Sequence, residues 1–185
     1  MARVPLLDDK TNPELSDLIG TLRAGRRGTL INVYRLLLHS PALAESWFGH
    51  SNAVRWKTDL DGRLRELVIV RVASLLDADY IVNQHIPELT TPEGLGEAEL
   101  AELPHWRMAT CFSESERAAL AYADMMTRDV VVSDKVFEEL KDHFNERQVV
   151  ELTVLIGSYN MNARVLTALQ IDPQTQPDTA QNPEN

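Results

Sequence analysis

The stretch of sequence that decides the fold runs from Arg65 to His85 and reads RELVIVRVASLLDADYIVNQH. Its first part, together with the preceding Leu64, is almost entirely apolar as far as Leu76. The polar exceptions are Arg65, Glu66, Arg71 and Ser74. This pattern predicts a helix that is buried on most of its circumference.

Glu66 and His85 are the two best acid-base candidates of the chain, and they stand nineteen positions apart in this stretch. A carboxylate on a buried helix needs a partner, because a buried charge is costly unless it is paired or hydrogen-bonded. Histidine suits this role, since its unperturbed pKa lies close to neutrality. We therefore expect Glu66 and His85 to meet across a contact between two helices. From the spacing alone, a purely structural contact in the core stays open as an alternative.

Signals for the start of a helix recur along the chain. Asn12 before Pro13 predicts a helix that ends near Gly28, and Ser40 before Pro41 predicts the next one. Further N-caps are expected at Asp59 or Asp61, Asp79, Ser113, Ser133 and Asn145. The only β-branched run, Val130 to Val132, is too short to found a sheet. The predicted fold class is all-α.

Length and composition indicate one compact domain. The chain has 185 residues, of which 44% are hydrophobic, so one core is expected. We assign residues 1–171 to this domain. Residues 172–185 are predicted to be a disordered tail, because their sequence DPQTQPDTAQNPEN has no aliphatic or aromatic residue beyond one alanine.

Charge and cysteine content exclude several classes of protein. A net charge of −10 argues against a nucleic-acid partner, since phosphate binding needs clustered Lys and Arg. No apolar run approaches the ~18 residues of a membrane span. The start, MARVPLLDDK, has no apolar stretch of signal-peptide length, and one cysteine cannot form an intrachain disulfide. We expect a cytoplasmic protein with no membrane partner.

The residues around Glu66 and His85 resemble those of the carboxymuconolactone decarboxylase and alkylhydroperoxidase D superfamily of small all-helical proteins. In its peroxidase branch, a Glu precedes a C-x-x-C-x-x-x-H element with the same separation between Glu and His. The two cysteine positions of that element fall on Ala78 and Ile81. The resemblance also takes in HSPAL at 39–43 and ELTVLIGSYNMNARVLTALQI at 151–171, and so covers about residues 30–171. It implies a compact bundle of the alkylhydroperoxidase D-like type that forms a homo-oligomer, a trimer or a hexamer.

The missing cysteines decide between the branches of this family. Dithiol peroxidases need one thiolate to attack the peroxide and a second thiol to resolve the product. Ala78 and Ile81 can do neither. Cys111 lies outside the element, in ATCFSES, and is expected to be a small, partly buried residue. The resembled decarboxylases also lack the cysteine pair but keep Glu and His, so a dithiol peroxidase is disfavoured.

The resemblance thus implies a cofactor-independent lyase that acts on a small carboxylated lactone or oxidised aromatic fragment. In such a reaction a carboxylate leaves as carbon dioxide, and its electrons enter a conjugated carbonyl before a proton is added. We assign His85 as the proton donor and Glu66 as the residue that orients it. Tyr80 matches a tyrosine of cysteine-free relatives with the pattern Y-E-W-x-x-H, although Ile81 and Val82 replace the Glu and Trp. It is the candidate donor to the enolate, with packing as the alternative.

Three polar residues are candidates for substrate binding. Arg71, on the Glu66 helix, is placed to anchor a substrate carboxylate through a bidentate contact, and an intersubunit or intrahelical ion pair is the alternative. Asn83 and Gln84 are polar neighbours of His85. The last helix carries a polar stripe, expected to link helices, that consists of Tyr159, Asn160, Asn162 and Arg164. No histidine pair has metal-ligand spacing, so neither a metal nor a cofactor is proposed.

Other functions stay open at this point. The same Glu-His pair serves an isomerase or a hydratase equally well. A non-catalytic oligomeric binding or assembly protein would keep Glu66 and His85 for packing alone. A third alternative is a peroxidase-related protein that has lost its chemistry or borrows a thiol from a partner.

Overall fold

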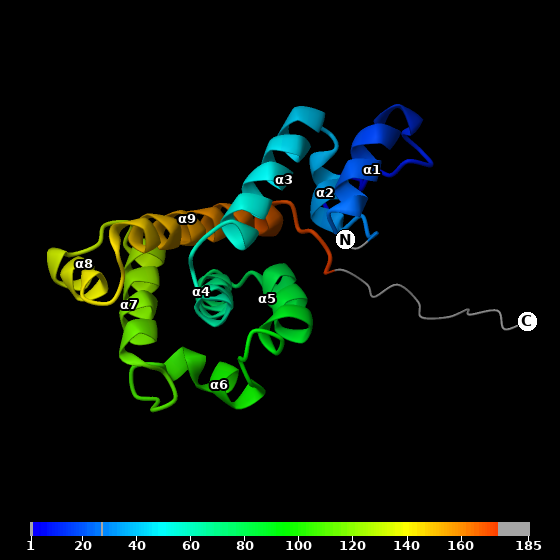
Figure 1. Cartoon of the computed structure of the whole chain (residues 1–185). Coiled ribbons are helices and arrows are strands. Elements are labelled where there is room, and N and C mark those ends of the chain that lie inside the picture. The colour runs from blue at the N-terminus through cyan, green and yellow to red at the C-terminus, as the bar shows by residue number, and fades with distance from the viewer. Residues whose placement is uncertain (1, 27, 174–185) are drawn as a thin grey trace, which may run out of the picture.

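The computed structural model describes residues 2–26 and 28–173, and the regular structure of these residues is entirely helical (Figure 1). The α-helices, in chain order, are α1 (Ser16–Ala24), α2 (Asn32–Leu37), α3 (Pro41–Trp56), α4 (Gly62–Leu75), α5 (Asp79–His85), α6 (Glu97–Glu102), α7 (Glu114–Arg128), α8 (Asp134–Lys141) and α9 (Glu146–Ala168). Three further short helices are described, namely the 3-10 helices η1 (Pro13–Leu15) and η3 (Leu103–His105) and the π-helix η2 (Ile86–Thr90). The prediction of an all-α fold is confirmed.

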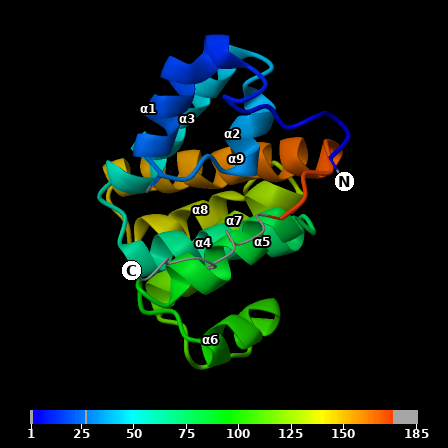
Figure 2. The ribbon, with the colours of Figure 1, turned by 90° about the vertical axis from the view of Figure 1, so that its right-hand side faces the viewer.

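Helix α4 lies at the centre of the fold. Every residue from Leu64 to Ala73 is buried, as the apolar run predicts. Helices α5, α7 and α9 pack against it (Figure 2). Leu67 and Val70 contribute to a smaller apolar cluster under α6 and η3, while Val68 and neighbouring side chains belong to the main core. Because α4 is covered on several sides, its polar residues must find partners inside the protein.

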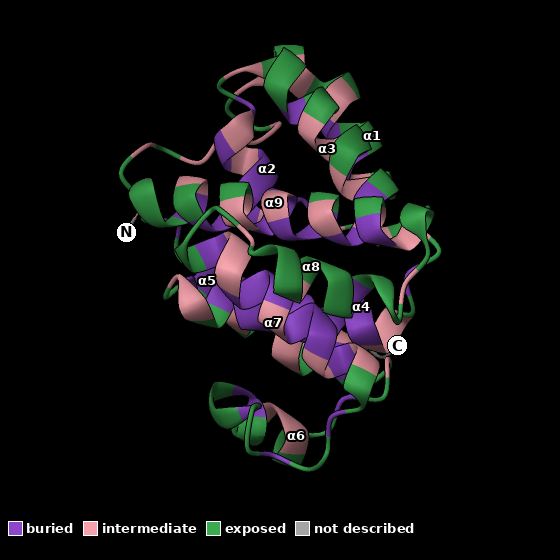
Figure 3. Ribbon diagram, turned by 90° about the vertical axis from the view of Figure 1, so that its left-hand side faces the viewer, coloured by how far each residue is buried: buried purple, intermediate pink, exposed green. Residues whose placement is uncertain are grey.

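Helices α1, α2 and α3 form a separate layer on the other side of α9 from α4 (Figure 2). Helix α3 packs against α1, α2 and α9. Buried residues gather on the faces that α4, α7 and α9 turn toward one another, whereas α8 carries mostly exposed residues (Figure 3). The C-terminal end of α3, at Arg55, reaches Glu66 of α4. The layer of α1 to α3 is thereby joined to the central helix.

Most predicted helix starts are confirmed. Helix α3 begins at Pro41, and Asp61 caps α4 by accepting hydrogen bonds from the backbone of Arg63 and Leu64. Ser133 caps α8, and the two capping boxes are formed at Ser113 and Asn145. Asp79 is different, since it is the first residue of α5 and Ala78 is the N-cap.

The first helix is shorter than predicted. It ends at Ala24 instead of near Gly28, and the next residue, Gly25, packs so closely against the Phe48 ring of α3 that a Cβ at this position would meet it. Gly28 then adopts a φ of 83°, a conformation that glycine tolerates and other residues rarely adopt. In the same segment, Arg26 donates hydrogen bonds to Tyr34 of α2 and Asn52 of α3.

The described part of the chain ends at residue 173, just past the predicted domain limit. Ile171 is buried, and the carboxylate of Asp172 accepts a hydrogen bond from the backbone of Ala2 at 3.2 Å. The remainder of the predicted tail, from residue 174 on, lies outside the described residues. The domain limits drawn from the sequence stay a prediction. None of the helices in the described ranges is both long enough and apolar enough to cross a membrane.

Candidate active site

Helices α4 and α5 bring Glu66 and His85 into direct contact. Nδ1 of His85 lies 2.6 Å from Oε2 of Glu66, and the Glu66 side chain has no exposed surface. His85 is also buried. The predicted pairing is confirmed, while a catalytic role for the pair stays a prediction.

Two arginines surround the second oxygen of Glu66. Nη2 of Arg55, from α3, lies 3.0 Å from Oε1, and Nε of Arg65 lies 3.5 Å from the same oxygen. Burial raises the pKa of Glu66, but the hydrogen bond with His85 and the positive charges of Arg55 and Arg65 outweigh burial and hold the pKa below its usual value. Glu66 is therefore a carboxylate at neutral pH.

His85 is correspondingly neutral. Burial lowers the pKa of His85, and the charges of Arg55 and Arg65 lower it further, against the opposing effect of Glu66. A carboxylate only accepts hydrogen bonds, so Nδ1 carries the proton of the neutral ring and donates a hydrogen bond to Glu66. Nε2 keeps its lone pair and is the basic atom of the ring.

Tyr159 of α9 lies beside this lone pair. Its hydroxyl is 3.4 Å from Nε2, and its ring meets the imidazole edge to face with the centroids 5.5 Å apart. Burial raises the pKa of Tyr159 to about 12, so the hydroxyl stays protonated at neutral pH. Tyr159 is thus a third member of the site, on a helix that is seventy-four residues distant from His85 in sequence.

A cavity of about 570 Å³ lies beside this group, a size that suits a small molecule. Helix α5 contributes Tyr80, Asn83, Gln84 and His85 to its wall, all predicted site residues. The layer of α1 to α3 contributes further lining side chains, among them Arg26, Tyr34, Trp47, Arg55 and Trp56. The cavity therefore combines aromatic walls with a few polar groups.

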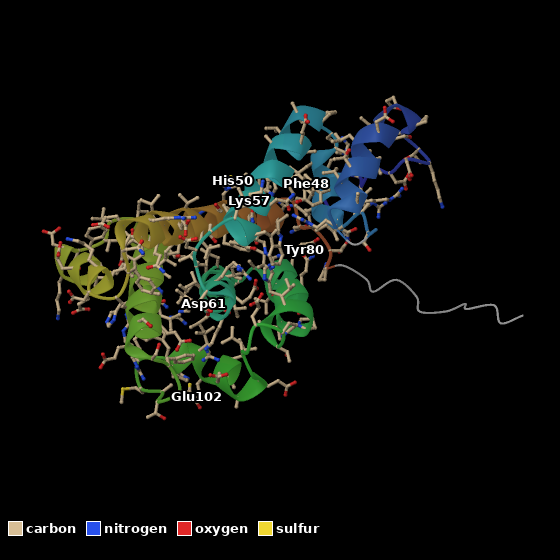
Figure 4. The ribbon with its side chains drawn as sticks, viewed as in Figure 1. Phe48, His50, Lys57, Asp61, Tyr80 and Glu102 are labelled. Atoms are coloured by element: carbon tan, nitrogen blue, oxygen red, sulfur yellow. The ribbon has the colours of Figure 1, made fainter. Side chains whose placement is uncertain are left out.

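Tyr80 lines this cavity, on the side of α5 that faces α2 and α3 (Figure 4). Its side chain is buried, and its hydroxyl has no hydrogen-bond partner among the described residues. Burial raises the pKa of Tyr80 to about 12, against a smaller opposite effect of the Val33 backbone. The hydroxyl is therefore protonated, its hydrogen has no acceptor among the described residues, and its action on an enolate stays a prediction.

The structure contradicts the predicted role of Arg71. Its guanidinium binds Asp124 of α7 in a bidentate ion pair, with Nε 2.6 Å from Oδ1 and Nη2 2.9 Å from Oδ2. Nη1 donates to the backbone oxygen of Leu103 at 3.2 Å. Arg71 follows Glu66 by five residues, which turns it by about 140° around α4 and toward α7 instead of the cavity. The predicted alternative was an intersubunit or intrahelical ion pair, whereas the observed pair joins two helices, α4 and α7, of one chain.

Sequence reasoning missed the functional position of several residues. Arg26 and Arg55 belong to no local motif, and only the packing of α3 onto α4 brings Arg55 to Glu66. Tyr159 and Asn162 were visible as part of a polar stripe on the last helix, and that stripe was the available signal. Cys111 is exposed, not partly buried as expected, and does not line the cavity. Within the described ranges no cluster of three His, Cys, Asp or Glu side chains could hold a metal ion.

Residues 41–125 match the model of the carboxymuconolactone decarboxylase family. The uncharacterized protein YnjA of Escherichia coli (strain K12) is 33% identical over 122 residues, which cover 65% of this chain and 66% of that protein. The uncharacterized protein YdfG of Bacillus subtilis (strain 168) is 24% identical over 115 residues, which cover 61% of this chain and 78% of that protein.

Solved structures with this fold include a protein of unknown function from Agrobacterium tumefaciens that has been proposed as an antioxidant defence protein AhpD. It aligns with a TM-score of 0.71 and 25% identity, over 76% of this chain and 97% of that one. An uncharacterized peroxidase-related protein from Ralstonia eutropha JMP134, described as an alkylhydroperoxidase AhpD core, aligns with a TM-score of 0.78 and 18% identity, over 94% of this chain and 92% of that one. The debrominase Bmp8 in complex with 2,3,4-tribromopyrrole aligns with a TM-score of 0.77 and 19% identity, over 92% and 91%. These last two likenesses concern the fold alone.

The helical architecture and these similarities agree with the resemblance seen in the sequence. The chain is similar to the carboxymuconolactone decarboxylase and alkylhydroperoxidase D superfamily, both in the segment that the family model matches and in its fold.

Proposed function

We propose that this protein is a cofactor-independent lyase of the carboxymuconolactone decarboxylase type, acting on a small carboxylated lactone or oxidised aromatic fragment. The observation that carries the proposal is the 2.6 Å contact between His85 Nδ1 and Glu66 Oε2, which leaves Nε2 as a base in the wall of a cavity. The match of residues 41–125 to the carboxymuconolactone decarboxylase family supports it, since that family takes its name from such a decarboxylase.

The neutral state of His85 refines the role assigned from the sequence. In a decarboxylation the bond between the carboxylate and its neighbouring carbon breaks, carbon dioxide leaves, and the electron pair enters the conjugated carbonyl as an enolate. The enolate carbon then takes one proton, so the reaction consumes a proton overall. Neutral His85 has no proton on Nε2 to give, and must take one up from solvent first. A substrate carboxylate in the cavity favours this uptake, because a nearby negative charge raises the pKa of an imidazole.

Tyr80 and Tyr159 complete the machinery. Both hydroxyls are protonated at neutral pH, and both side chains line the cavity. A hydroxyl that donates to the carbonyl oxygen stabilises negative charge as it develops there. Tyr80 keeps this predicted role. Tyr159 contacts Nε2, so we assign it to the positioning of the imidazole.

An isomerase is the second candidate, and the neutral His85 favours it. A neutral Nε2 can remove a proton from a carbon next to a carbonyl and return it to another carbon of the enolate. No proton is consumed overall, so His85 can start the reaction as the neutral imidazole and need not first take up a proton from solvent. The non-catalytic binding or assembly protein remains the alternative in which the Glu-His contact serves packing.

Turnover in deuterium oxide separates these functions. A panel of carboxylated lactones would be incubated with the protein, with carbon dioxide measured by headspace analysis and the products by mass spectrometry. The lyase predicts stoichiometric carbon dioxide and one deuterium in the product. Deuterium incorporation without carbon dioxide would show the isomerase if the product has no added water, and a hydratase if it has. Unchanged substrates across the panel would contradict both enzymes and favour the binding protein.

A further inference from the structure

Three buried polar atoms stand out in the described part of the chain because they have no hydrogen-bond partner. They are Nε of Arg55, the hydroxyl oxygen of Tyr80 and Oδ1 of Asn162. Buried polar atoms in folded proteins are almost always hydrogen-bonded, since an unmet donor or acceptor costs about 1–3 kcal/mol. All three residues line the same cavity. Their convergence on one space indicates a binding site, and the Tyr80 side chain is 94% buried there, being 6% exposed.

The charged side chains in the cavity wall are all positive among the described residues. Arg26 and Arg55 line the cavity, and no Asp or Glu is among the described residues that line it. The cavity is thus electropositive in a chain whose net charge is −10. Such a site attracts an anion and repels a cation.

Arg26 is the cavity cation whose charge is not balanced by a carboxylate among the described residues. Arg55 shares its charge with Glu66, whereas Arg26 has no carboxylate partner within the described residues. Its guanidinium is held by neutral groups, with Nη1 2.7 Å from Oδ1 of Asn52 and Nη2 2.8 Å from the Tyr34 hydroxyl. It also lies 5.0 Å from the centre of the Phe48 ring. These contacts fix its position without neutralising it.

The donor or acceptor character of the three unpaired atoms indicates which groups a ligand should carry. Nε of Arg55 can only donate, and the protonated Tyr80 hydroxyl is a donor, so both suit an anionic oxygen. Oδ1 of Asn162 accepts, so it suits a hydroxyl of the ligand. Trp47 and Trp56 add aromatic surface to the wall, which suits a flat ring.

We propose that the cavity is a binding site for a small flat hydroxy acid, whose carboxylate binds Arg26, Arg55 and the Tyr80 hydroxyl and whose hydroxyl binds Asn162. This inference deepens the proposed function, on which it rests for the view that the bound acid is a substrate. Arg26, from the segment after α1, takes the anchoring role that the sequence assigned to Arg71.

Calorimetric titration with three probes tests the site without any turnover. The probes are 4-hydroxybenzoate, benzoate and the neutral 4-hydroxybenzamide. We expect saturable binding of 4-hydroxybenzoate at up to millimolar concentration, weaker binding of benzoate and no measurable binding of the amide. Equal affinity for the acid and the amide, or no binding of either acid, would overturn the proposal.

Two variants assign the contacts. Arg26→Gln should weaken 4-hydroxybenzoate binding roughly 10- to 100-fold, because it removes a charged hydrogen bond. Arg128→Gln is the matched control, since it removes one exposed positive charge outside the cavity and should leave the affinity unchanged. An equal loss in both variants would reduce the effect to general electrostatics and contradict the site.

Tyr80→Phe provides an independent test of the binding site in case Arg26→Gln folds poorly. Because the Tyr80 hydroxyl has no partner within the described residues, its removal should leave the melting temperature unchanged or higher. Binding of 4-hydroxybenzoate should nevertheless weaken several-fold, and unaltered affinity would count against the proposal. If binding follows these expectations but no lactone is turned over, the site stands and the proposed enzyme fails.

Discussion

Arg55 connects the wall of the cavity to the buried acid Glu66. Its Nη2 donates to Oε1 of Glu66 at 3.0 Å, while its Nε is left without a protein partner within the described residues. One guanidinium therefore stabilises the carboxylate that holds His85 and is also available to a ligand. Charge on a bound ligand and the protonation of His85 are coupled through this contact.

Replacement of Arg55 by methionine tests this coupling. Arg55 lowers the pKa of His85, so Arg55→Met should raise that pKa, with the change measured by NMR titration of the imidazole. The exposed Arg147→Gln is the control and should leave His85 as in the wild type. An unchanged or lower pKa in Arg55→Met would show that the arginine does not tune the histidine.

Stability should fall with acid over a defined pH range. Both His85 and Glu66 have pKa values below their ordinary values of 6.5 and 4.5, so the unfolded chain binds protons more readily than the folded one. Each group therefore contributes to the free energy of unfolding in full above its unfolded pKa. That contribution is lost as the pH falls toward the folded pKa, first for His85 and then for Glu66. Urea denaturation at about pH 7.5 and about pH 5.5 measures the His85 part of this loss.

The variant His85→Gln isolates that part. Without the titrating imidazole, the difference in unfolding free energy between the two pH values should shrink. His143→Gln changes an exposed histidine and should keep the wild-type difference. If both variants behave like the wild type, His85 is not held neutral by the fold.

Much of the fold could be predicted from the sequence, because its signals are local. The apolar run of α4 and the caps at Asp61, Ser113 and Asn145 depend on residues within a few positions of one another. The Glu66 and His85 pair was also accessible, because adjoining helices in the chain pack against each other.

The rest of the site could not be predicted, since it depends on packing between distant segments. Arg71 was assigned to the substrate, but its partner Asp124 is fifty-three residues away on α7. Tyr159 reaches His85 from seventy-four residues away. Arg26 lines the cavity from the turn after α1, where the neighbouring Gly25 packs closely on Phe48. No local pattern records such contacts.

Redox chemistry by a thiol pair should be absent. Ala78 is the N-cap of α5 and Ile81 lines the cavity, so no thiol stands at either expected position. Purified protein should show no dithiol-dependent reduction of organic hydroperoxides, and Cys111→Ser should preserve any native activity. Peroxide turnover that vanishes in Cys111→Ser would give the exposed cysteine a role.

We predict a homo-oligomer, a trimer or a hexamer. Several large apolar side chains of α3 and α9 are exposed in the single chain, namely Leu43, Trp56, Val150, Val154 and Met161. Exposed apolar surface of this kind favours association. Light scattering should report a multiple of 20.8 kDa, and removal of residues 174–185 should not change it. A monomer at micromolar concentration would contradict the prediction.

The direct test of the central claim is lactone turnover by Glu66→Gln and His85→Ala, measured beside thermal melting with His143→Ala as the control. The account predicts that His85→Ala abolishes turnover and that Glu66→Gln reduces it roughly 100-fold or more, since the imidazole loses the charge that fixes its tautomer. Both variants should remain folded and assembled. A structural pair predicts the opposite, a loss of about 3–5 kcal/mol of stability from breaking a buried charged contact. A wild type without turnover, together with a large drop in the melting temperature of His85→Ala, would contradict the account.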